Sequence, residues 1–199
     1  MDQAAVEAGA PVNSINCMSN LSMEATDTLM HSKEVKLIIA TGGPGMVKAA
    51  YSAGKPAIGV GAGNSPSYIE RTADVREAVE QIMASKTFDN GTVCASEQSI
   101  ICEKVNEAEV ISELERQGGY FMTEEETNKV CDLLFKNGHA MNAGFVARAP
   151  QVIADAAGIT IPEGTRLLVG RQKGVGAGNP LSYEKLTTVI AFYTVEDWQ

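Results

Sequence analysis

The sequence predicts an α/β protein with a parallel sheet, and three observations lead to that fold class. Short apolar runs that suit buried strands alternate with amphipathic stretches that suit helices. Glycine-rich turns follow several of the apolar runs, as they do where a strand leads into a helix. The 199 residues are 44% hydrophobic and 21% charged, which is typical of a globular domain. Right-handed crossovers join strands that alternate with helices, and such crossovers produce a parallel sheet.

The first part of the chain alternates the two kinds of element. In chain order, the predicted elements are a helix end at 4–9, a strand at 12–18, a helix at 22–32, a buried strand at 36–41, a helix at 46–53 and a strand at 55–63. Ser22 is expected to cap its helix, because a serine oxygen can accept from the free N–H groups of the first turn. Gly9 and Gly54 are expected to end theirs.

The second part continues in the same way. The predicted elements are helices at 72–88, 123–138 and 149–158 and strands at 99–104, 166–170 and 188–195. Thr123 and Glu126 have the spacing of a capping box, and Gly158 is a predicted helix stop. The alternation changes its spacing at the glycines of 61–63, so we place a domain boundary there.

Composition excludes several classes of function. A formal net charge of -9 disfavours a nucleic-acid or anionic-membrane partner. No apolar run reaches the ~18 residues of a membrane span, and "MDQAAVEAGAPV" does not read as a signal peptide. The cysteines have no CxxC spacing and no histidine cluster, so no metal site is expected. Free thiols in a reducing cytosol are expected instead.

A glycine-rich turn, Thr41-Gly42-Gly43-Pro44-Gly45, joins the predicted strand at 36–41 to the helix that follows. Glycine lets an anion approach the backbone closely, and a helix N-terminus adds free N–H groups and positive dipole. A pyrophosphate could therefore bind here. The pattern is neither GxGxxG nor a P-loop, so a tight strand–helix connection is the alternative.

Cys94 is the candidate nucleophile among the four cysteines. It lies in a small, polar, glycine-containing stretch, whereas Cys17, Cys102 and Cys131 occupy positions that read as apolar strand or helix. A nucleophilic cysteine needs access and thiolate character, and a cysteine at an apolar position acts as a small hydrophobe. The alternative is that Cys94 is structural too.

Two other kinds of cysteine chemistry fit less well. A Cys–His hydrolase needs a general base, but His31 ends a predicted helix and His139 follows a glycine turn. A redox sensor needs a resolving cysteine close to Cys94. Cys102 is eight residues away (102 − 94) and lies in a predicted strand.

Three separated stretches together resemble the CoA-acylating aldehyde dehydrogenases. They are "ATGGPGMVKAAYSAGKPAIGVGAGN", "KTFDNGTVCASEQS" and "YEKLTTVIAFY". This family includes the acetaldehyde dehydrogenase half of bifunctional aldehyde–alcohol dehydrogenase and enzymes of ethanolamine and propanediol breakdown. The resemblance implies that 1–62 is the last part of a Rossmann-like dinucleotide-binding domain and 63–199 the catalytic domain. It also implies that the fold is incomplete at both ends.

The resemblance assigns roles to individual residues. Cys94 matches the catalytic cysteine, which would form a thioester with the substrate, and its N–H would be one oxyanion donor. Glu184 matches the residue that binds the nicotinamide ribose, and Leu186 matches the apolar position beside the nicotinamide. The other cofactor-binding positions are Thr41, Gly42, Gly43, Gly45 and Gly61. The implied cofactor is NAD, with coenzyme A as co-substrate.

One position that differs between branches of the resembled family bears on the activation of water. Hydrolytic aldehyde dehydrogenases carry a water-activating glutamate where this sequence has Val60. A site that passes its thioester to a thiol should not activate water. Val60 therefore fits acylating chemistry, although it could equally be a buried strand residue.

The expected function is NAD-dependent oxidation of a short-chain aldehyde to acyl-CoA. The alternative is a catalytically incompetent α/β fragment that binds nucleotide or associates with intact subunits. The chain starts within a predicted helix and stops four residues after a predicted strand, so we expect a piece of a larger protein. The resemblance implies a homo-oligomer for the full-length protein, and a location in the cytoplasm or inside a bacterial microcompartment.

Overall fold

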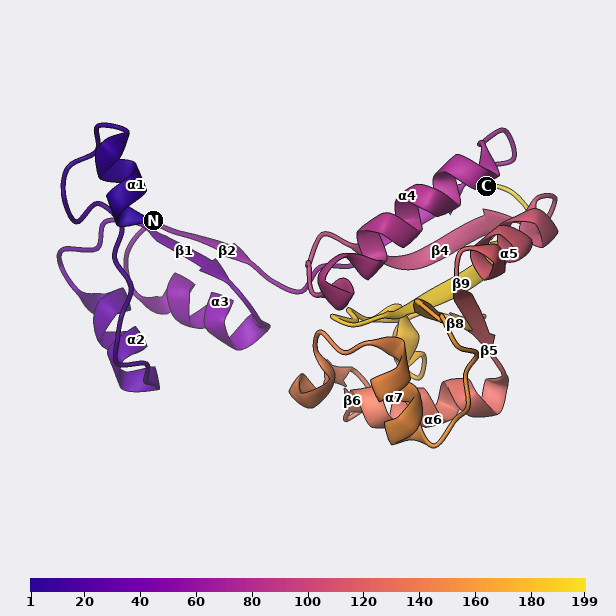
Figure 1. Cartoon of the computed structure of the whole chain (residues 1–199). Coiled ribbons are helices and arrows are strands. Elements are labelled where there is room, and N and C mark those ends of the chain that lie inside the picture. Colours follow the sequence, from indigo (N-terminus) through magenta and orange to yellow (C-terminus); the bar gives the residue numbers. More distant parts are fainter. The chain divides into compact units, whose positions relative to one another are not determined.

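The computed structural model describes all 199 residues, which form two compact units, Met1–Ala62 and Gly63–Gln199. The division falls within the glycines of 61–63. The roles expected for the two units, dinucleotide binding and catalysis, stay predictions. Figure 1 labels the elements of each unit.

The first unit is a small α/β layer. Its elements are α1 (Asp2–Glu7), α2 (Met23–His31), β1 (Ile38–Thr41), α3 (Pro44–Ser52) and β2 (Ala57–Val60). The two strands pair in parallel, with Ile38 opposite Ala57 and Thr41 opposite Val60. α3 connects them, as a crossover helix does. A core of four small or medium residues lies between α3 and the strands: Ile38, Ala40, Ala50 and Ala53.

Predictions for this unit were partly right. Ser22 caps α2 and accepts from the Ala25 N–H, as expected. The predicted strand at 12–18 is wrong, because this segment forms turns held by its own polar side chains. There Ser14 Oγ donates to the Pro11 carbonyl and Asn16 Nδ2 to the Asn13 carbonyl. The strand predicted as buried at 36–41 corresponds to β1, whose residues alternate between buried and exposed. Ile39, for example, is 71% exposed.

A five-stranded, fully parallel sheet organises the second unit, in the order β3-β4-β9-β8-β5. The strands are β3 (Ser65–Ile69), β4 (Glu97–Glu103), β5 (Gly119–Met122), β8 (Leu167–Arg171) and β9 (Val189–Val195). Helices cover both faces (Figure 1): α4 (Val75–Thr87) and α5 (Glu107–Arg116) on one, α6 (Glu124–Leu134) and α7 (Pro150–Ala157) on the other. The predicted α/β fold class is confirmed.

The sheet has a separate core on each face because successive side chains of a strand point to opposite sides. In β9, Ile190 and Phe192 pack beneath α4 and α5, whereas Val189 and Ala191 pack beneath α6 and α7. Central strands of a parallel sheet are buried on both faces, and they therefore read as continuous apolar runs.

Short elements complete this unit. They are the hairpin β6 (Phe135–Lys136) and β7 (Ala140–Met141) and the 3-10 turns η1 (Phe88–Gly91), η2 (Ala143–Phe145) and η3 (Pro180–Ser182). The helix predicted to reach 138 ends at Leu134, because the chain turns into this hairpin. Strands β3 and β5 and helix α5 were not predicted. The chain contains no helix with the length and apolar character needed to cross a membrane.

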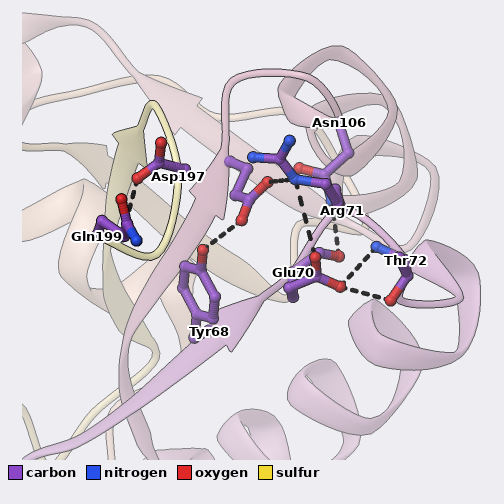
Figure 2. Close-up of polar contacts among 8 residues, drawn as sticks. Tyr68, Glu70, Arg71, Thr72, Asn106, Asp197 and Gln199 are labelled. Carbon is purple, nitrogen blue, oxygen red and sulfur yellow. Dashed lines mark hydrogen bonds and ion pairs between the residues drawn. The ribbon is translucent and has the colours of Figure 1, made fainter.

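A buried carboxylate joins the C-terminal ends of β3 and β4 (Figure 2). The Glu103 side chain is fully buried, accepts from Tyr68 Oη at 2.6 Å and pairs with Arg71 Nε at 2.5 Å. Partial burial and Glu103 raise the pKa of Tyr68 to about 12. The cluster lies at the end of β4 that is remote from Cys94.

Candidate active site

The candidate nucleophile lies in the loop that joins α4 to β4, which we call the Cys94 loop (residues 88–96). Asp89, Asn90 and Gly91 have φ values of 49°, 50° and 74°. Aspartate, asparagine and glycine adopt this left-handed conformation most readily, so the Asp-Asn-Gly sequence suits the sharp turn. An added Cβ on Gly91 would lie 2.5 Å from the Thr187 carbonyl oxygen, so only glycine allows this approach.

Cys94 itself lies in a tight turn closed by a hydrogen bond from the Ser96 N–H to the Val93 carbonyl at 3.0 Å. Its side chain is exposed. The Cys94 N–H donates to no group of the chain. The turn therefore presents an accessible thiol together with a backbone donor that remains available.

The other cysteines differ in environment. Cys102 and Cys131 are buried, as predicted, and burial raises the pKa of each thiol to about 11. A thiol with a raised pKa is a poor nucleophile near neutral pH. Cys17 was expected at an apolar strand position, but it is exposed in an irregular segment.

Gly63 brings the Cys94 turn and Glu184 together. Its N–H donates to Glu184 Oε1 at 2.7 Å. A Cβ added to Gly63 would lie 2.1 Å from the Cys94 carbonyl oxygen and 3.4 Å from Glu184 Oε1. Gly63 therefore lies between Cys94, the candidate nucleophile, and Glu184, the candidate ribose-binding carboxylate.

The segment with Glu184 and Leu186 is anchored along its length. Asn64 Nδ2 donates to the Ser182 carbonyl at 2.8 Å, and the Leu186 carbonyl accepts from the Ala147 N–H at 2.9 Å. Leu186 is half-buried, and Glu184 uses only Oε1 within the chain. The second carboxylate oxygen of Glu184 remains available to a ligand.

Two buried residues, which the sequence did not single out, support the Cys94 loop. Lys86 Nζ donates to the Lys185 carbonyl at 2.8 Å, and Gln98 Oε1 accepts from the Lys185 N–H at 2.8 Å. Burial lowers the pKa of Lys86 to about 7, although Glu97 and Glu184 partly oppose the shift. Gly63 was also missed as a site residue, although it lies in one of the stretches that resemble the family.

The glycine-rich turn lies in the first unit, between β1 and α3. The Gly42 N–H donates to the Val60 carbonyl at 3.1 Å, and Gly43 is the N-cap of α3. A Cβ added to Gly43 or Gly45 would meet no atom within 4 Å. The first turn of a helix has free N–H groups, so this open backbone fits a phosphate group.

The candidate residues thus fall into two sets. Cys94, Glu184 and Leu186 belong to Gly63–Gln199, where Gly63 joins the first two. The second set belongs to Met1–Ala62 and comprises Thr41, Gly42, Gly43, Gly45 and Gly61.

Two further residues bear on the chemistry of the site. Val60 is 49% exposed, so its interpretation as a buried strand residue is wrong. His31 and His139 are exposed, and the Nδ1 atom of each bonds to a nearby backbone carbonyl.

Comparison with known proteins identifies the family of the chain. The model of the aldehyde dehydrogenase family matches residues 1–173. The bifunctional aldehyde-alcohol dehydrogenase AdhE of Escherichia coli K12 is 46% identical over 198 residues, which are 99% of this chain and 22% of AdhE.

Solved structures similar to this chain are also aldehyde dehydrogenases. An acetylating aldehyde dehydrogenase from Geobacillus thermoglucosidasius is 49% identical with a TM-score of 0.93, and the match covers 98% of this chain and 43% of that one. A propionaldehyde dehydrogenase from Rhodopseudomonas palustris, solved with bound CoA and an acylated cysteine, is 26% identical with a TM-score of 0.84. That match covers 98% of this chain and 44% of the other. The chain therefore spans less than half the length of these relatives, and it belongs to the aldehyde dehydrogenase family.

Proposed function

We propose that this chain carries the nucleophile of an NAD-dependent, CoA-acylating aldehyde dehydrogenase that converts a short-chain aldehyde to acyl-CoA. The observation that carries the proposal is the Cys94 turn, with its exposed thiol, its free N–H and Glu184 next to it across Gly63. The related propionaldehyde dehydrogenase with CoA and an acylated cysteine supports a thioester at this type of site.

The chemistry begins at the Cys94 sulfur. The thiolate forms a C–S bond to the aldehyde carbon, and the carbonyl oxygen takes the electron pair of the broken π bond. The free Cys94 N–H donates a hydrogen bond to this oxyanion, and such preorganised donors stabilise developing charge. When bound, the nicotinamide of NAD supplies the hydride acceptor, so that the Cys94 adduct becomes a thioester. The thiol of coenzyme A then takes the acyl group, and the C–S bond to Cys94 breaks.

The residues proposed for the cofactor have chemistry that fits a dinucleotide. The open backbone of Gly43 and Gly45 suits the pyrophosphate. Thr41 and Gly42 precede these glycines, and Gly61 follows Val60, the partner of Thr41 in the sheet. Glu184 Oε2 is available to a ribose hydroxyl, and half-buried Leu186 offers an apolar surface to the nicotinamide. These assignments make Glu184 and Leu186 binding residues and Cys94 the catalytic one.

The resemblance assigns to Val60 the position at which hydrolytic aldehyde dehydrogenases carry a water-activating glutamate. A thioester is hydrolysed when a base activates water beside it, and valine has no group that can accept the proton. His139 lies exposed in the turn between β6 and β7, with its Nδ1 bonded to the Asn137 carbonyl and no hydrogen bond to the Cys94 loop. We therefore expect transfer to coenzyme A to be faster than hydrolysis.

A second candidate function follows from the length of the match. The chain covers 43% of the Geobacillus enzyme, so a catalytically incompetent chain that binds nucleotide or associates with intact subunits is the alternative. A homo-oligomer of the full-length protein, located in the cytoplasm or a bacterial microcompartment, is part of the proposal in either case.

The decisive experiment follows NADH absorbance with acetaldehyde, NAD and coenzyme A. The proposal predicts NADH formation that requires coenzyme A and is lost in Cys94→Ala, with Cys17→Ala as the matched control for an exposed thiol. If the 199-residue chain is inactive and a longer chain containing it is active, the second candidate is correct. Activity that survives Cys94→Ala would reject both the nucleophile and the mechanism.

A further inference from the structure

Lys86 is a buried lysine with no salt-bridge partner. It lies in the last turn of α4, where a lysine normally reaches solvent, yet none of its surface is exposed. Its Nζ donates to two neutral acceptors, the Lys185 carbonyl at 2.8 Å and Gln98 Oε1 at 3.4 Å. A buried amine is costly unless its donors are used, so this placement requires an explanation beyond packing.

Gln98 completes the arrangement from the other side of the Cys94 loop. It is fully buried in β4, and its Oε1 also accepts from the Lys185 N–H at 2.8 Å. The Lys185 residue is therefore bound at both its N–H and its carbonyl. The two donors also fix the orientation of the Gln98 amide, because a flipped amide would place its NH₂ group against them. Its Nε2 has no partner in this orientation.

The three groups form a closed hydrogen-bonded ring, which we call the buried ring: Lys86 Nζ, Gln98 Oε1 and the backbone of Lys185. Lys86 lies eight residues before Cys94 (94 − 86), and Gln98 lies four residues after it (98 − 94). The helix before the Cys94 loop and the strand after it are thus both bonded to Lys185, which lies between Glu184 and Leu186.

We propose that Lys86 is a positioning residue, which acts through the buried ring to fix the Cys94 loop against the segment that carries Glu184 and Leu186. The inference rests on the proposed function of Cys94 and extends it to residues that touch no substrate. A neutral amine has two N–H groups, and these suffice for the two acceptors of the ring. The low pKa of Lys86 is therefore compatible with its role.

Two variants interrupt the buried ring from opposite ends of the loop. Lys86→Met removes both donors while keeping an unbranched apolar chain, and Gln98→Met removes the acceptor. Glu103→Gln is the matched control, because it alters an equally buried charged residue at the far end of β4. If one ring variant fails to fold, the other provides the test.

The first measurement compares two reactions of Cys94. Iodoacetamide alkylation requires an accessible thiolate but no donor to an oxyanion. Acetylation by p-nitrophenyl acetate requires an oriented thiolate, because the thiolate forms the thioester as p-nitrophenolate leaves through a charged intermediate. Misplacement of a reacting group by about 1 Å can cost about a hundredfold in rate. We expect acetylation to fall by about that factor in both ring variants, whereas alkylation and the Glu103→Gln variant stay near the wild-type rates.

The second measurement does not depend on Cys94 chemistry. It is amide hydrogen exchange at Thr92 and Ser96, whose N–H groups bond within the Cys94 loop and not to the ring. We expect exchange at both amides to be faster than in the wild type in each ring variant. In Glu103→Gln we expect it to stay at the wild-type rate. Unchanged exchange in the ring variants, equal acceleration in Glu103→Gln, or unchanged acetylation in the ring variants would overturn the proposal. If wild-type Cys94 is never acetylated, the proposed function fails, and the exchange result alone decides the role of the ring.

Discussion

At the scale of single residues, Gly63 determines how closely Cys94 and Glu184 approach each other. Its N–H bonds to Glu184, and the space where a Cβ would lie is taken by the Cys94 carbonyl. No side chain larger than hydrogen fits without moving one of these groups. Gly63 is therefore as much a part of the site as the residues with reactive side chains.

Substitution of Gly63 tests this close approach. We expect Gly63→Ala to lower the free energy of unfolding by about 1–3 kcal/mol, the usual cost of overpacking. Urea unfolding followed by circular dichroism measures it. Gly144→Ala is the control, since an added Cβ there meets only Asn142 Oδ1 at an ordinary 3.5 Å. Equal stability of the two variants would contradict the crowding at Gly63.

Lys86 makes stability depend on pH in a defined direction. Burial lowers its pKa from 10.5 to about 7 in the folded chain. Between these two values the unfolded chain binds more protons than the folded one, so stability rises with pH across this window. We expect the free energy of unfolding of the wild type to rise, relative to Lys86→Met, between pH 7 and about 10. A constant difference across this range would show that Lys86 titrates normally.

Residue chemistry predicted some of these roles and missed others. The polar surroundings of Cys94 predicted an accessible thiol, which the structure confirms, whereas its role as a nucleophile stays a prediction. Apolar neighbours correctly identified Cys102 and Cys131 as buried. Lys86 could not be predicted, because a lysine at the end of an amphipathic helix usually interacts with solvent and the helix dipole. Its burial depends on Gln98 and Lys185, which only the folded sheet brings close to it.

At the scale of elements, local capping signals predicted the start of α6 and the end of α7, although the glycine stop expected at 138 did not end α6. Thr123 and Glu126 form the capping box that begins α6, and Glu126 also accepts from Tyr120 Oη at 3.0 Å. Gly158 ends α7 with a φ of 65°. Such signals are reliable because each satisfies backbone groups that the helix itself cannot.

The N-cap of α6 gives a prediction at this scale. Thr123→Ala should lower the free energy of unfolding by about 1 kcal/mol, because the Glu126 N–H loses its acceptor. Thr123→Ser keeps a hydroxyl and should stay close to the wild type. Chemical denaturation of the three proteins measures the difference. An alanine variant as stable as the serine variant would contradict the capping role.

The errors in strand prediction have physical reasons. β3 contains Pro66, which has no N–H to donate and is normally found only on edge strands, and β3 is the edge of the sheet. β5 has only four residues. The false strand at 12–18 had apolar residues but also asparagines and serines that prefer turns. Tertiary position thus explains β3, whereas the short length of β5 and the local turn residues of 12–18 explain the other two.

At the scale of the whole molecule, the two units differ in the size of their cores. The first unit buries Ile38 and three alanines, whereas the second has two extensive clusters on opposite faces of its sheet. Ile39, Ile58 and Val60 on β1 and β2 remain exposed. Burial of apolar area is the main source of stability, so the first unit is expected to be the less stable one.

Native-state hydrogen exchange tests this difference. We expect the amides of β1 and β2 to exchange with a lower free energy of opening than those of β4 and β9. Exchange measured across a low range of denaturant separates local from global opening. A single free energy for all four strands would mean that the chain unfolds as one cooperative unit.

The sequence predicted the fold class, the boundary near 61–63 and the residues that carry the proposed chemistry, because these depend on local pattern and on matching stretches. It did not predict how Gly63, Lys86 and Gln98 connect Cys94 to Glu184. Those contacts join positions up to 121 residues apart, and they exist only in the folded second unit.

Transfer of an acyl group from acetyl-CoA tests the central claim most directly, because it requires no dinucleotide. The Cys94 thiol would attack the thioester, and coenzyme A would leave with its thiol restored. Peptide mass spectrometry after incubation with acetyl-CoA should find the acetyl group on Cys94 and not on Cys17, which is also exposed, and excess coenzyme A should remove it. Equal labelling of Cys17 and Cys94, or no label on Cys94, would contradict the assignment of Cys94 as a thioester-forming nucleophile.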